Sequence, residues 1–340
     1  MRACRKGYWP VIFRRAGYTT FHVGKWHQDR DSFRRSYLMG EAIHFSGMSD
    51  HYAVDIRPFD ASGVYPDSDV RIEKGIHSSE LFANAAVRFL RSEDAQKPFF
   101  AYIAFTAPHD PREAPREYRG RYEAADMLLP PNFMPQHPFD NGELKVRDEL
   151  LESYPRKPKA IQKHLADYYA MISHLDSPIG RILETLDETG LASNTIVVFA
   201  GDNGIALGQH GLMGKQNLYE HSLHVPLIFR GPGIAAGKTC DALVYLSDVY
   251  LTLCDLASIP RPPLIEGESL VTAMNDNASG RDSLFFAYKH FQRALRWRPW
   301  KLILYNVRGN ERTQLFNLEE DPWEMQDRSE DPSCTSRLRK

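Results

Sequence analysis

This sequence lacks abundant cysteine, long apolar runs and an excess of either charge. Four of its 340 residues are cysteines, and they are too few and too widely spaced for a disulfide framework. No apolar stretch is long enough to cross a bilayer, and none follows the first basic residues in the manner of a signal peptide. The net charge of −2 gives no reason to expect nucleic acid or a membrane as a partner.

The residues that are present have the proportions of an ordinary globular protein. Hydrophobic residues make up 42% of the chain, aromatic residues 11% and charged residues 25%. A chain of this length can bury a large core, and its length favours one large domain followed by a smaller unit. We expect an α/β domain over residues 1–278 and a small subdomain over residues 279–340.

Hydrophobic periodicity predicts alternating helices and strands in the larger part. Helices are expected over residues 10–16, 79–92, 161–186 and 248–257, and strands over residues 19–23, 99–105, 195–200 and 225–230. Strand 99–105 is apolar on both faces, as expected at the centre of a parallel sheet. Residues 31–66 show little periodicity and are interpreted as a long loop. The third helix has one continuous apolar stripe, formed by Ile161, Leu165, Tyr168, Ile172, Leu175, Ile179, Ile182 and Leu186.

After the proline-rich residues 260–263, the pattern changes to short strands. They are expected over residues 284–288, 294–297, 301–305 and 313–316, with turns at 298–299 and 309–310. The whole chain is therefore predicted to have an α/β fold with a large, mostly parallel sheet flanked by helices. A small antiparallel α+β subdomain is expected at its C-terminal end.

Four short motifs, each following a predicted strand or lying close to one, contain the candidate functional residues. In chain order they are GKWH at residues 24–27, APHDP at 107–111, GDNG at 201–204 and GKQNLYE at 214–220. In open α/β sheets, ligands bind where loops leave the carboxyl ends of the strands. We therefore expect the four motifs to share one cleft.

The residue types in these motifs suit the hydrolysis of an oxyanion ester. Lys25 and Lys215 can hold sulfate oxygens, and an imidazole, from His27 or His109, can protonate a departing alcohol. Asp202 and Asn203 offer hard oxygen ligands to a cation such as calcium. Each preorganised charge of this kind can stabilise a transition state by several kcal/mol. A single motif of this sort is more often a turn or a solvated loop, so the prediction rests on the ordered set.

In this order, the motifs resemble those of the type I sulfatases of the alkaline-phosphatase superfamily. The resemblance extends from GYTT at residues 17–20 to LFNL at residues 315–318. Two parts of the family pattern are absent: an opening strand that ends in two metal-binding aspartates, and the motif Cys-x-Pro-Ser-Arg, whose cysteine becomes the nucleophile formylglycine. Cys4 lacks the proline and serine and lies too close to GKWH to match. The chain is thus expected to correspond to a sulfatase that begins after its own nucleophile.

The resemblance implies catalytic roles for four residues. Lys25 and Lys215 match lysines that contact the sulfate and the nucleophile. His27 matches the histidine that helps to collapse the covalent sulfate intermediate, and His109 matches the general acid toward the leaving group. Without a nucleophile, these 340 residues alone are expected to have negligible activity.

Metal and substrate contacts are expected from other residues. By the resemblance, Asp202 and Asn203 match two calcium ligands, so calcium is expected to bind weakly or not at all without the remaining ligands. His210 and Trp26 are candidates for substrate contacts, with a structural role as the alternative for each. No role is assigned to five other histidines: His22, His44, His51, His77 and His137.

The leading hypothesis is a sulfuric ester hydrolase that acts on a sulfated small molecule or carbohydrate. One alternative is a phosphate or phosphonate ester hydrolase of the same superfamily, although relatives that handle phosphorus commonly have a histidine at the position of Asn203. The other alternative is a protein without activity that binds anionic glycans. Family resemblance implies a periplasmic or secreted location, and the oligomeric state is left open.

Overall fold

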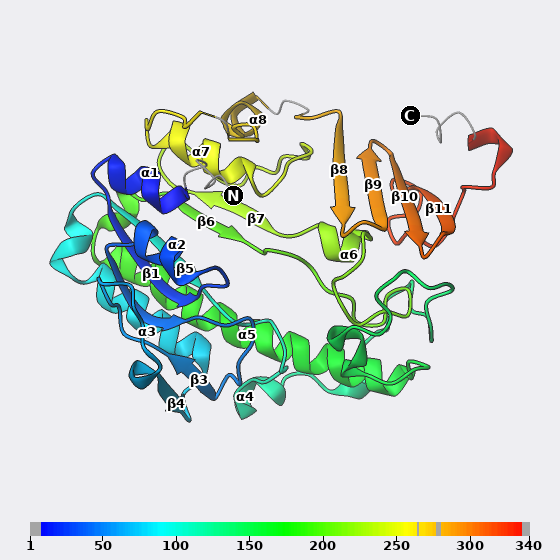
Figure 1. The fold of residues 1–340 in the computed structure, drawn as a ribbon, viewed down its shortest axis with the longest axis horizontal. Coiled ribbons are helices and arrows are strands. Elements are labelled where there is room, and N and C mark those ends of the chain that lie inside the picture. The colour runs from blue at the N-terminus through cyan, green and yellow to red at the C-terminus, as the bar shows by residue number, and fades with distance from the viewer. Residues whose placement is uncertain (1–7, 264, 277–279, 335–340) are drawn as a thin grey trace. The chain divides into compact units, whose positions relative to one another are not determined.

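The structure is a computed structural model that describes residues 8–263, 265–276 and 280–334 (Figure 1). The chain forms two compact units, and it enters each of them more than once. Unit 1 comprises residues 1–123, 166–196 and 250–267, and unit 2 comprises residues 124–165, 197–249 and 268–340. Cys4 and the domain boundary expected between residues 278 and 279 lie outside the described residues, so that boundary stays a prediction.

A three-stranded parallel sheet forms the centre of unit 1. Strand β1 (Thr19–Lys25) lies between β2 (Met39–His44) and β5 (Phe99–Ala104), and both pairs are parallel. Phe21 of β1 is buried and stacks on Phe89 at a centroid distance of 4.1 Å. Burying each such side chain stabilises the fold by about 1.5–3 kcal/mol. The parallel sheet of the predicted α/β fold is confirmed.

The other regular elements of unit 1 are labelled in Figure 1. Besides the part of α5 (Pro158–Glu188) described below and short 3-10 helices, they are α1 (Trp9–Arg15), α2 (Arg30–Ser36), β3 (Ala53–Ile56), β4 (Arg71–Lys74), α3 (Ser78–Leu90), α4 (Arg116–Arg119) and most of α7 (Asp248–Leu256). Strands β3 and β4 pair with each other in an antiparallel hairpin.

Two sequence predictions for unit 1 are wrong in detail. The expected loop over residues 31–66 contains α2, β2 and β3. Strand β2 was missed because its glycine and glutamate have low strand propensity and only its last three residues are buried, so that its pairing with β1 determines its structure. Strand β5 lies at an edge of the described sheet instead of at its centre, and Tyr102 is 42% exposed there.

The long helix α5 (Pro158–Glu188) begins in unit 2 and continues in unit 1 from residue 166. Most of its predicted apolar stripe is buried or half-buried, but Ile172 is 41% exposed and its neighbour Met171 is fully buried instead. Over the described ranges, no helix combines the length and the apolarity needed to span a membrane.

Unit 2 contains a separate two-stranded sheet. Strands β6 (Val197–Ala200) and β7 (Leu227–Arg230) pair with each other and are antiparallel. Both strands were predicted, but they were expected to extend the parallel sheet, which they do not do within the described strands. Periodicity identifies an apolar strand without specifying its partner. Phe199 and Ile228 are 41% and 57% exposed on these strands.

The predicted C-terminal sheet is confirmed as four antiparallel strands in the order β11-β10-β9-β8. The strands are β8 (Ser283–Tyr288), β9 (Gln292–Trp297), β10 (Trp300–Val307) and β11 (Asn310–Asn317), and two short helices, α6 (Glu220–Leu223) and α8 (Val271–Asp276), precede them. The turn between β10 and β11 has positive φ at Arg308 and Gly309, as a tight hairpin requires.

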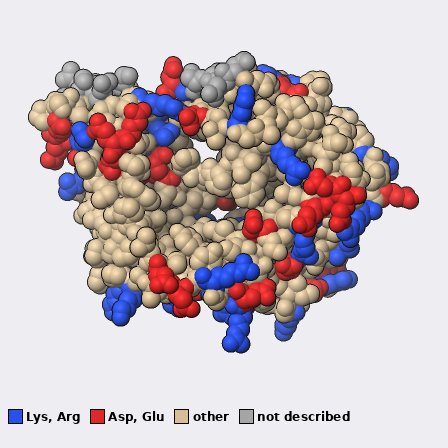
Figure 2. All heavy atoms as spheres, turned by 180° about the vertical axis from the view of Figure 1, so that it is seen from behind, with Lys and Arg blue, Asp and Glu red and all other residues tan. Residues whose placement is uncertain are grey.

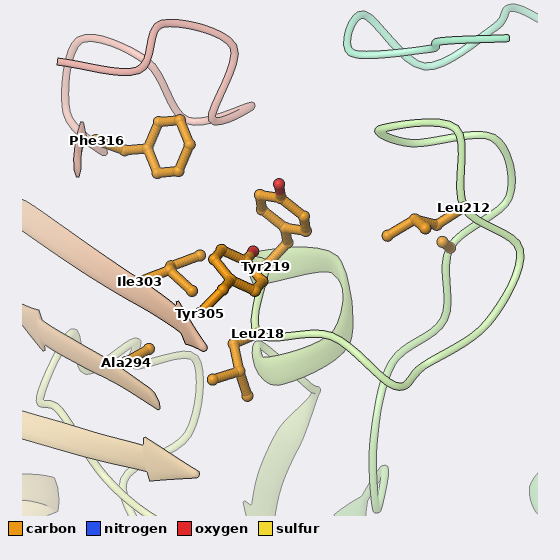
Figure 3. Packing of buried hydrophobic residues seen from close by; sticks show 8 residues of the cluster. Leu212, Leu218, Tyr219, Ala294, Ile303, Tyr305 and Phe316 are labelled. Atoms are coloured by element: carbon orange, nitrogen blue, oxygen red, sulfur yellow. The ribbon is translucent and has the colours of Figure 1, made fainter. Parts of the chain in front are cut away.

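The main core of unit 2 lies between this sheet and the segment that leads into α6. Leu218, Tyr219, Ile303 and Tyr305 are buried and gather in one cluster (Figure 3). On the outside of the protein, Figure 2 shows Lys and Arg interspersed with Asp and Glu over the visible face, as the nearly balanced composition predicts.

Candidate functional site

Lys25 and His109 follow the carboxyl ends of two neighbouring parallel strands in unit 1. Lys25 is the last residue of β1, and His109 comes shortly after β5 ends. The two strands pair with Gly24 opposite Ala104, so the chain leaves both at the same edge of the sheet. Lys25 is half-buried, and the side chain of His109 is 22% exposed. A cation and an imidazole therefore leave the sheet at the edge where open α/β sheets bind their ligands.

Gly24 allows β1 to lie close to β5 at this point. Its φ is +89°, and a Cβ built on it would lie 2.1 Å from the carbonyl oxygen of Ala104. Any other residue would be strained and would collide with backbone that cannot move without separating the strands.

Replacing Gly24 by alanine is expected to lower the free energy of unfolding by about 2–4 kcal/mol, because a steric clash adds to the strain of a left-handed conformation. Gly17→Ala is a matched control, since Gly17 has the same φ of +89° but no atom within 4 Å of the added Cβ. Urea unfolding of both variants measures the difference. Equal losses would contradict the importance of the close approach to β5.

His27 lies just beyond β1 and is exposed. Its ring rests on Gly47, because a Cβ built on Gly47 would lie 3.0 Å from Cε1 and 3.1 Å from Nε2 of His27. A side chain at position 47 would therefore displace the imidazole.

Trp26, the candidate sugar contact, is half-buried in an aromatic cluster. Its ring packs edge-on against Phe33 and Tyr37, at a centroid distance of 5.6 Å in both cases. This packing anchors the GKWH motif to unit 1. A substrate contact by Trp26 stays a prediction.

A buried carboxylate orients His109. Nδ1 of His109 lies 3.0 Å from the backbone oxygen of Asp110 and 3.3 Å from its Oδ1, and Asp110 is 7% exposed. Asp110 therefore favours the tautomer with its proton on Nδ1 and fixes the orientation of the ring. The motif pointed to His109 but not to this partner, although the two residues are adjacent in the chain.

A buried network holds the backbone of His109 from the other side. Nε2 of His51 lies 2.9 Å from the carbonyl oxygen of His109, so Nε2 carries the proton. Nδ1 of His51 must then accept, and Ser78 Oγ lies 2.8 Å from it. Since Ser78 donates to His51, Thr106 Oγ1, at 2.8 Å, donates to Ser78. No sequence signal distinguished His51, which had been given no role.

His51 belongs to a cluster of three histidines. The ring of His77 stacks on His51 at 4.8 Å, and His174 packs edge-on against His77 at 4.3 Å. Burial lowers the pKa of all three imidazoles, that of His77 to about 3. All three are therefore neutral at neutral pH.

In unit 2, Asp202 and Asn203 follow β6 as predicted, and both are exposed. Asp202 Oδ1 accepts the backbone N–H of Asn203 at 2.9 Å, and Asn203 Nδ2 donates to the backbone oxygen of Gly204 at 2.9 Å. Gly204 lies against α6, since a Cβ there would be 2.0 Å from the carbonyl oxygen of His221. This close approach explains why glycine follows the Asp-Asn pair.

Lys215 is half-buried within a polar network. Its backbone N–H donates to Gln216 Oε1 at 3.1 Å, and Gln216 Nε2 donates to Asp148 Oδ2 at 2.7 Å. Burial alone would raise the pKa of Asp148, but the hydrogen bonds from Gln216 and Arg147 and the charge of Lys215 lower it overall. Asp148 is thus an ionised neighbour of this lysine.

His210 is buried inside unit 2. It is 6% exposed, it stacks on Tyr219 at a centroid distance of 3.9 Å, and its Nε2 lies 3.1 Å from Asn132 Nδ2. These contacts account for its position by packing. A substrate contact by His210 stays a prediction.

The described residues do not form a complete calcium site. Across the described part of the chain, no group of three or more His, Cys, Asp or Glu side chains is arranged to hold a metal ion. Asp202 and Asn203 offer at most three side-chain oxygens, whereas calcium takes about six to eight. No step of a reaction is therefore assigned to calcium.

The candidate residues divide between the two units. Unit 1 contains Lys25, Trp26, His27 and His109, whereas unit 2 contains Asp202, Asn203, His210 and Lys215. In unit 1 the predicted residues follow strands of the parallel sheet, whereas in unit 2 Asp202 and Asn203 follow a strand of the separate antiparallel pair. Their convergence in one cleft stays a prediction.

Two family models match the chain. A model described as "Sulfatase" matches residues 8–259, and one described as "N-sulphoglucosamine sulphohydrolase, C-terminal" matches residues 208–340. Among curated relatives, an arylsulfatase of Clostridium perfringens is 32% identical over 262 residues, which are 74% of this chain and 54% of that protein. An N-acetylglucosamine-6-O-sulfatase of Bacteroides thetaiotaomicron is 28% identical over 396 residues, covering 95% of this chain and 67% of the relative. The chain thus spans about half to two thirds of the length of these relatives.

Solved structures share the fold. A protein in complex with its substrate D-glucosamine-2-N,6-O-disulfate superposes with a TM-score of 0.79 at 22% identity, over 98% of this chain and 80% of that one. A phosphonate monoester hydrolase of Agrobacterium radiobacter superposes with a TM-score of 0.75 at 18% identity, over 98% of this chain and 78% of that one. At these identities, the comparisons establish the alkaline-phosphatase-like fold.

Proposed function

Because the chain belongs to the sulfatase family, we propose that it supplies the anion-binding and leaving-group part of a sulfuric ester hydrolase that acts on sulfated carbohydrate. The observation that carries this proposal is the placement of Lys25 and His109 at one edge of the parallel sheet, with His109 oriented by Asp110. Relatives and neighbours support a sugar substrate, since one is named an N-acetylglucosamine-6-O-sulfatase and another was solved with a sulfated glucosamine.

The proposed chemistry assigns one task to each residue. Lys25 and Lys215 hold sulfate oxygens and compensate their negative charge. As the bond between sulfur and the ester oxygen breaks, His109 gives a proton to that oxygen, so that the sugar leaves as a neutral alcohol. His27 would assist the release of sulfate where a nucleophile is supplied to take the sulfuryl group. The nucleophile that takes the sulfuryl group has no candidate in the described residues, because the formylglycine motif does not occur in the sequence.

Two alternatives remain weaker proposals. A phosphonate hydrolase is among the structural neighbours, but the family matches and the curated relatives are sulfatases, and Asn203 replaces the histidine expected for phosphorus chemistry. A protein that binds anionic glycans without hydrolysing them would use the same lysines, and only measured turnover separates it from the enzyme.

Calcium is expected to bind this polypeptide more weakly than micromolar, because Asp202 and Asn203 supply too few ligands. Calorimetric titration with calcium is the measurement, with Asp202→Asn as the matched variant. Micromolar or tighter binding that Asp202→Asn abolishes would show that other residues complete the site.

The substrate class can be tested without turnover by calorimetric binding of N-acetylglucosamine 6-sulfate. Lys25→Met and Lys215→Met are each expected to weaken binding by about 10- to 100-fold, because a charge-assisted contact contributes about 1.5–3 kcal/mol. Lys74→Met and Lys145→Met, at exposed lysines in unit 1 and unit 2, are the controls. Unchanged affinity in Lys25→Met and Lys215→Met, or equal affinity for the sugar without sulfate, would contradict the proposal.

A further inference from the structure

A buried ion pair in unit 2 holds the backbone that comes just before Lys215. Glu149 and Arg156 are 3% and 1% exposed, and Arg156 Nη2 lies 2.6 Å from Glu149 Oε2. Glu149 belongs to the 3-10 helix η4 (Arg147–Leu151), which lies far from Lys215 in the chain but in the same unit. Neither member of the pair lies in one of the four motifs.

Both carboxylate oxygens of Glu149 accept backbone N–H groups of this segment. The N–H of Met213 donates to Oε2 and the N–H of Gly214 donates to Oε1, each at 2.9 Å. The hydroxyl of Tyr154 also donates to Oε2, at 3.2 Å. Because the guanidinium of Arg156 and the two backbone N–H groups can only donate, Glu149 accepts as an ionised carboxylate. It therefore fixes two consecutive peptide groups.

Arg156 holds the same segment at a second point. Its Nε donates to the backbone oxygen of Gly211 at 3.1 Å, and its Nη1 donates to the backbone oxygen of Glu149 at 2.9 Å. The guanidinium also lies over the ring of Tyr154, 3.7 Å from the centroid. Because a guanidinium is planar and its N–H donors point in fixed directions, Arg156 sets the carboxylate and the Gly211 carbonyl in one geometry.

Gly214 allows the carboxylate to come close. A Cβ built on Gly214 would lie 2.6 Å from Gln216 Oε1 and 3.0 Å from Glu149 Oε1. A side chain at this position would therefore push the segment away from Glu149. This close approach explains the glycine that precedes Lys215 in the GKQNLYE motif.

The pair is better explained by the position that it enforces than by stability. Removing a carboxylate and a guanidinium from water is costly, and apolar residues of similar volume are often at least as stabilising. Burial accordingly raises the pKa of Glu149, although the N–H groups of Met213 and Gly214 and the charge of Arg156 oppose this shift. An apolar pair could not bond to the peptide groups of residues 211, 213 and 214.

The chain is also fixed on the other side of Lys215. The backbone oxygen of Lys215 accepts the N–H of Asn217 at 2.9 Å, and Asn217 is 3% exposed. Leu212 and Leu218, which flank the segment, are buried in the main core of unit 2 and are labelled in Figure 3. The point from which the side chain of Lys215 extends is therefore set from both directions.

We propose that Glu149, held by Arg156, is a positioning residue for Lys215 and fixes the segment from which the Lys215 ammonium group reaches the sulfate. This inference rests on the proposed function, since it names what sets one of the two sulfate-binding lysines. Glu149 and Arg156 themselves do not contact the sulfate. A charged group that is in place before its ligand arrives lowers the ordering cost of binding.

Competitive acetylation of the lysines in the folded protein, read by mass spectrometry, tests the position of Lys215 without any sugar. Glu149→Gln keeps the size of the side chain but removes its charge and one acceptor oxygen, so half-buried Lys215 is expected to react at least about threefold faster. Glu152→Gln is the matched control, because the Glu152 carboxylate accepts the N–H of Ser153. Lys301, which is fully buried in the same unit, reports whether the whole unit has opened.

A double-mutant cycle connects this position to binding. In calorimetric titrations with N-acetylglucosamine 6-sulfate, Glu149→Gln is expected to weaken binding by about 5- to 10-fold in the wild type. In the Lys215→Met background the same change should weaken binding by less than about twofold, because its effect passes through Lys215. Glu152→Gln should leave the affinity unchanged in both backgrounds.

Three results would overturn the proposal. The first is acetylation that accelerates at Lys301 together with Lys215, because Glu149 would then only stabilise the fold. The second is unchanged acetylation of Lys215 in Glu149→Gln, and the third is an equal loss of affinity with and without Lys215. Absence of any binding of the sulfated sugar to the wild type would instead contradict the proposed function, and the acetylation would still decide whether Glu149 positions Lys215.

Discussion

Sulfate release from an aryl sulfate by this 340-residue polypeptide is expected to be about a million-fold slower than release by an intact arylsulfatase of the family. Removing a catalytic nucleophile typically costs on that order in rate, and groups that position the substrate recover only a small part. Lys25, His109 and Lys215 can hold and protonate an ester, but the covalent route needs an atom to accept the sulfuryl group.

The measurement is a discontinuous sulfate assay with both proteins at equal concentration. His109→Gln provides the internal control: in the polypeptide it should leave the residual rate near background, because no covalent step is available for the general acid to assist. A rate within about a hundredfold of the intact relative, lost in His109→Gln, would mean that another residue acts as nucleophile.

Acidification from pH 6.5 to 4.5 is expected to destabilise unit 1 strongly, with His77 contributing about 2–3 kcal/mol. Burial lowers the pKa of His77 from 6.5 to about 3 in the folded state. Between these two values the unfolded chain binds a proton that the folded chain does not, so stability falls as the pH falls. Burial also lowers the pKa of His22 in the same unit to about 3, so the total loss exceeds that of one residue.

Urea unfolding between pH 4.5 and 7.5 measures this dependence. His77→Asn can retain the cap on α3, because the side chain of His77 accepts the N–H of Ser79 there and asparagine is a favourable cap. The slope of the unfolding free energy against pH gives the number of protons taken up on unfolding, and for this variant that number should be smaller by about one. His224→Gln is the control, since the side chain of His224 is 79% exposed. Parallel pH profiles for the wild type and His77→Asn would contradict the assignment.

Apolar periodicity correctly predicted the helices and strands whose own buried side chains recur at a regular spacing. Helix α5 and the four C-terminal strands occur where the pattern placed them, because their buried residues recur at the spacing of a helix or a strand. Strand β2 was missed, because its own residues have low strand propensity and its structure depends on pairing with β1. The partners of β5 and β6 could not be predicted either, because an apolar strand reads the same at an edge and at the centre of a sheet.

In the candidate site, too, the local sequence identified some residues, whereas others depend on contacts between distant segments. Lys25, His109, Asp202 and Lys215 were identified because each stands in a motif that follows or adjoins a strand. Asp110 could have been identified from the same motif, because it directly follows His109. His51 and Ser78 could not, because they support His109 through contacts between segments far apart in the chain.

We propose from the sequence motifs that Lys25 and Lys215 contact the same sulfate group. Mass spectrometry after treatment with a short amine-reactive cross-linker tests it directly, because both residues present primary amines. We expect a cross-linked peptide pair joining Lys25 to Lys215, and suppression of that pair by N-acetylglucosamine 6-sulfate but not by the sugar without sulfate. Single modification of both lysines with no pair between them would contradict it.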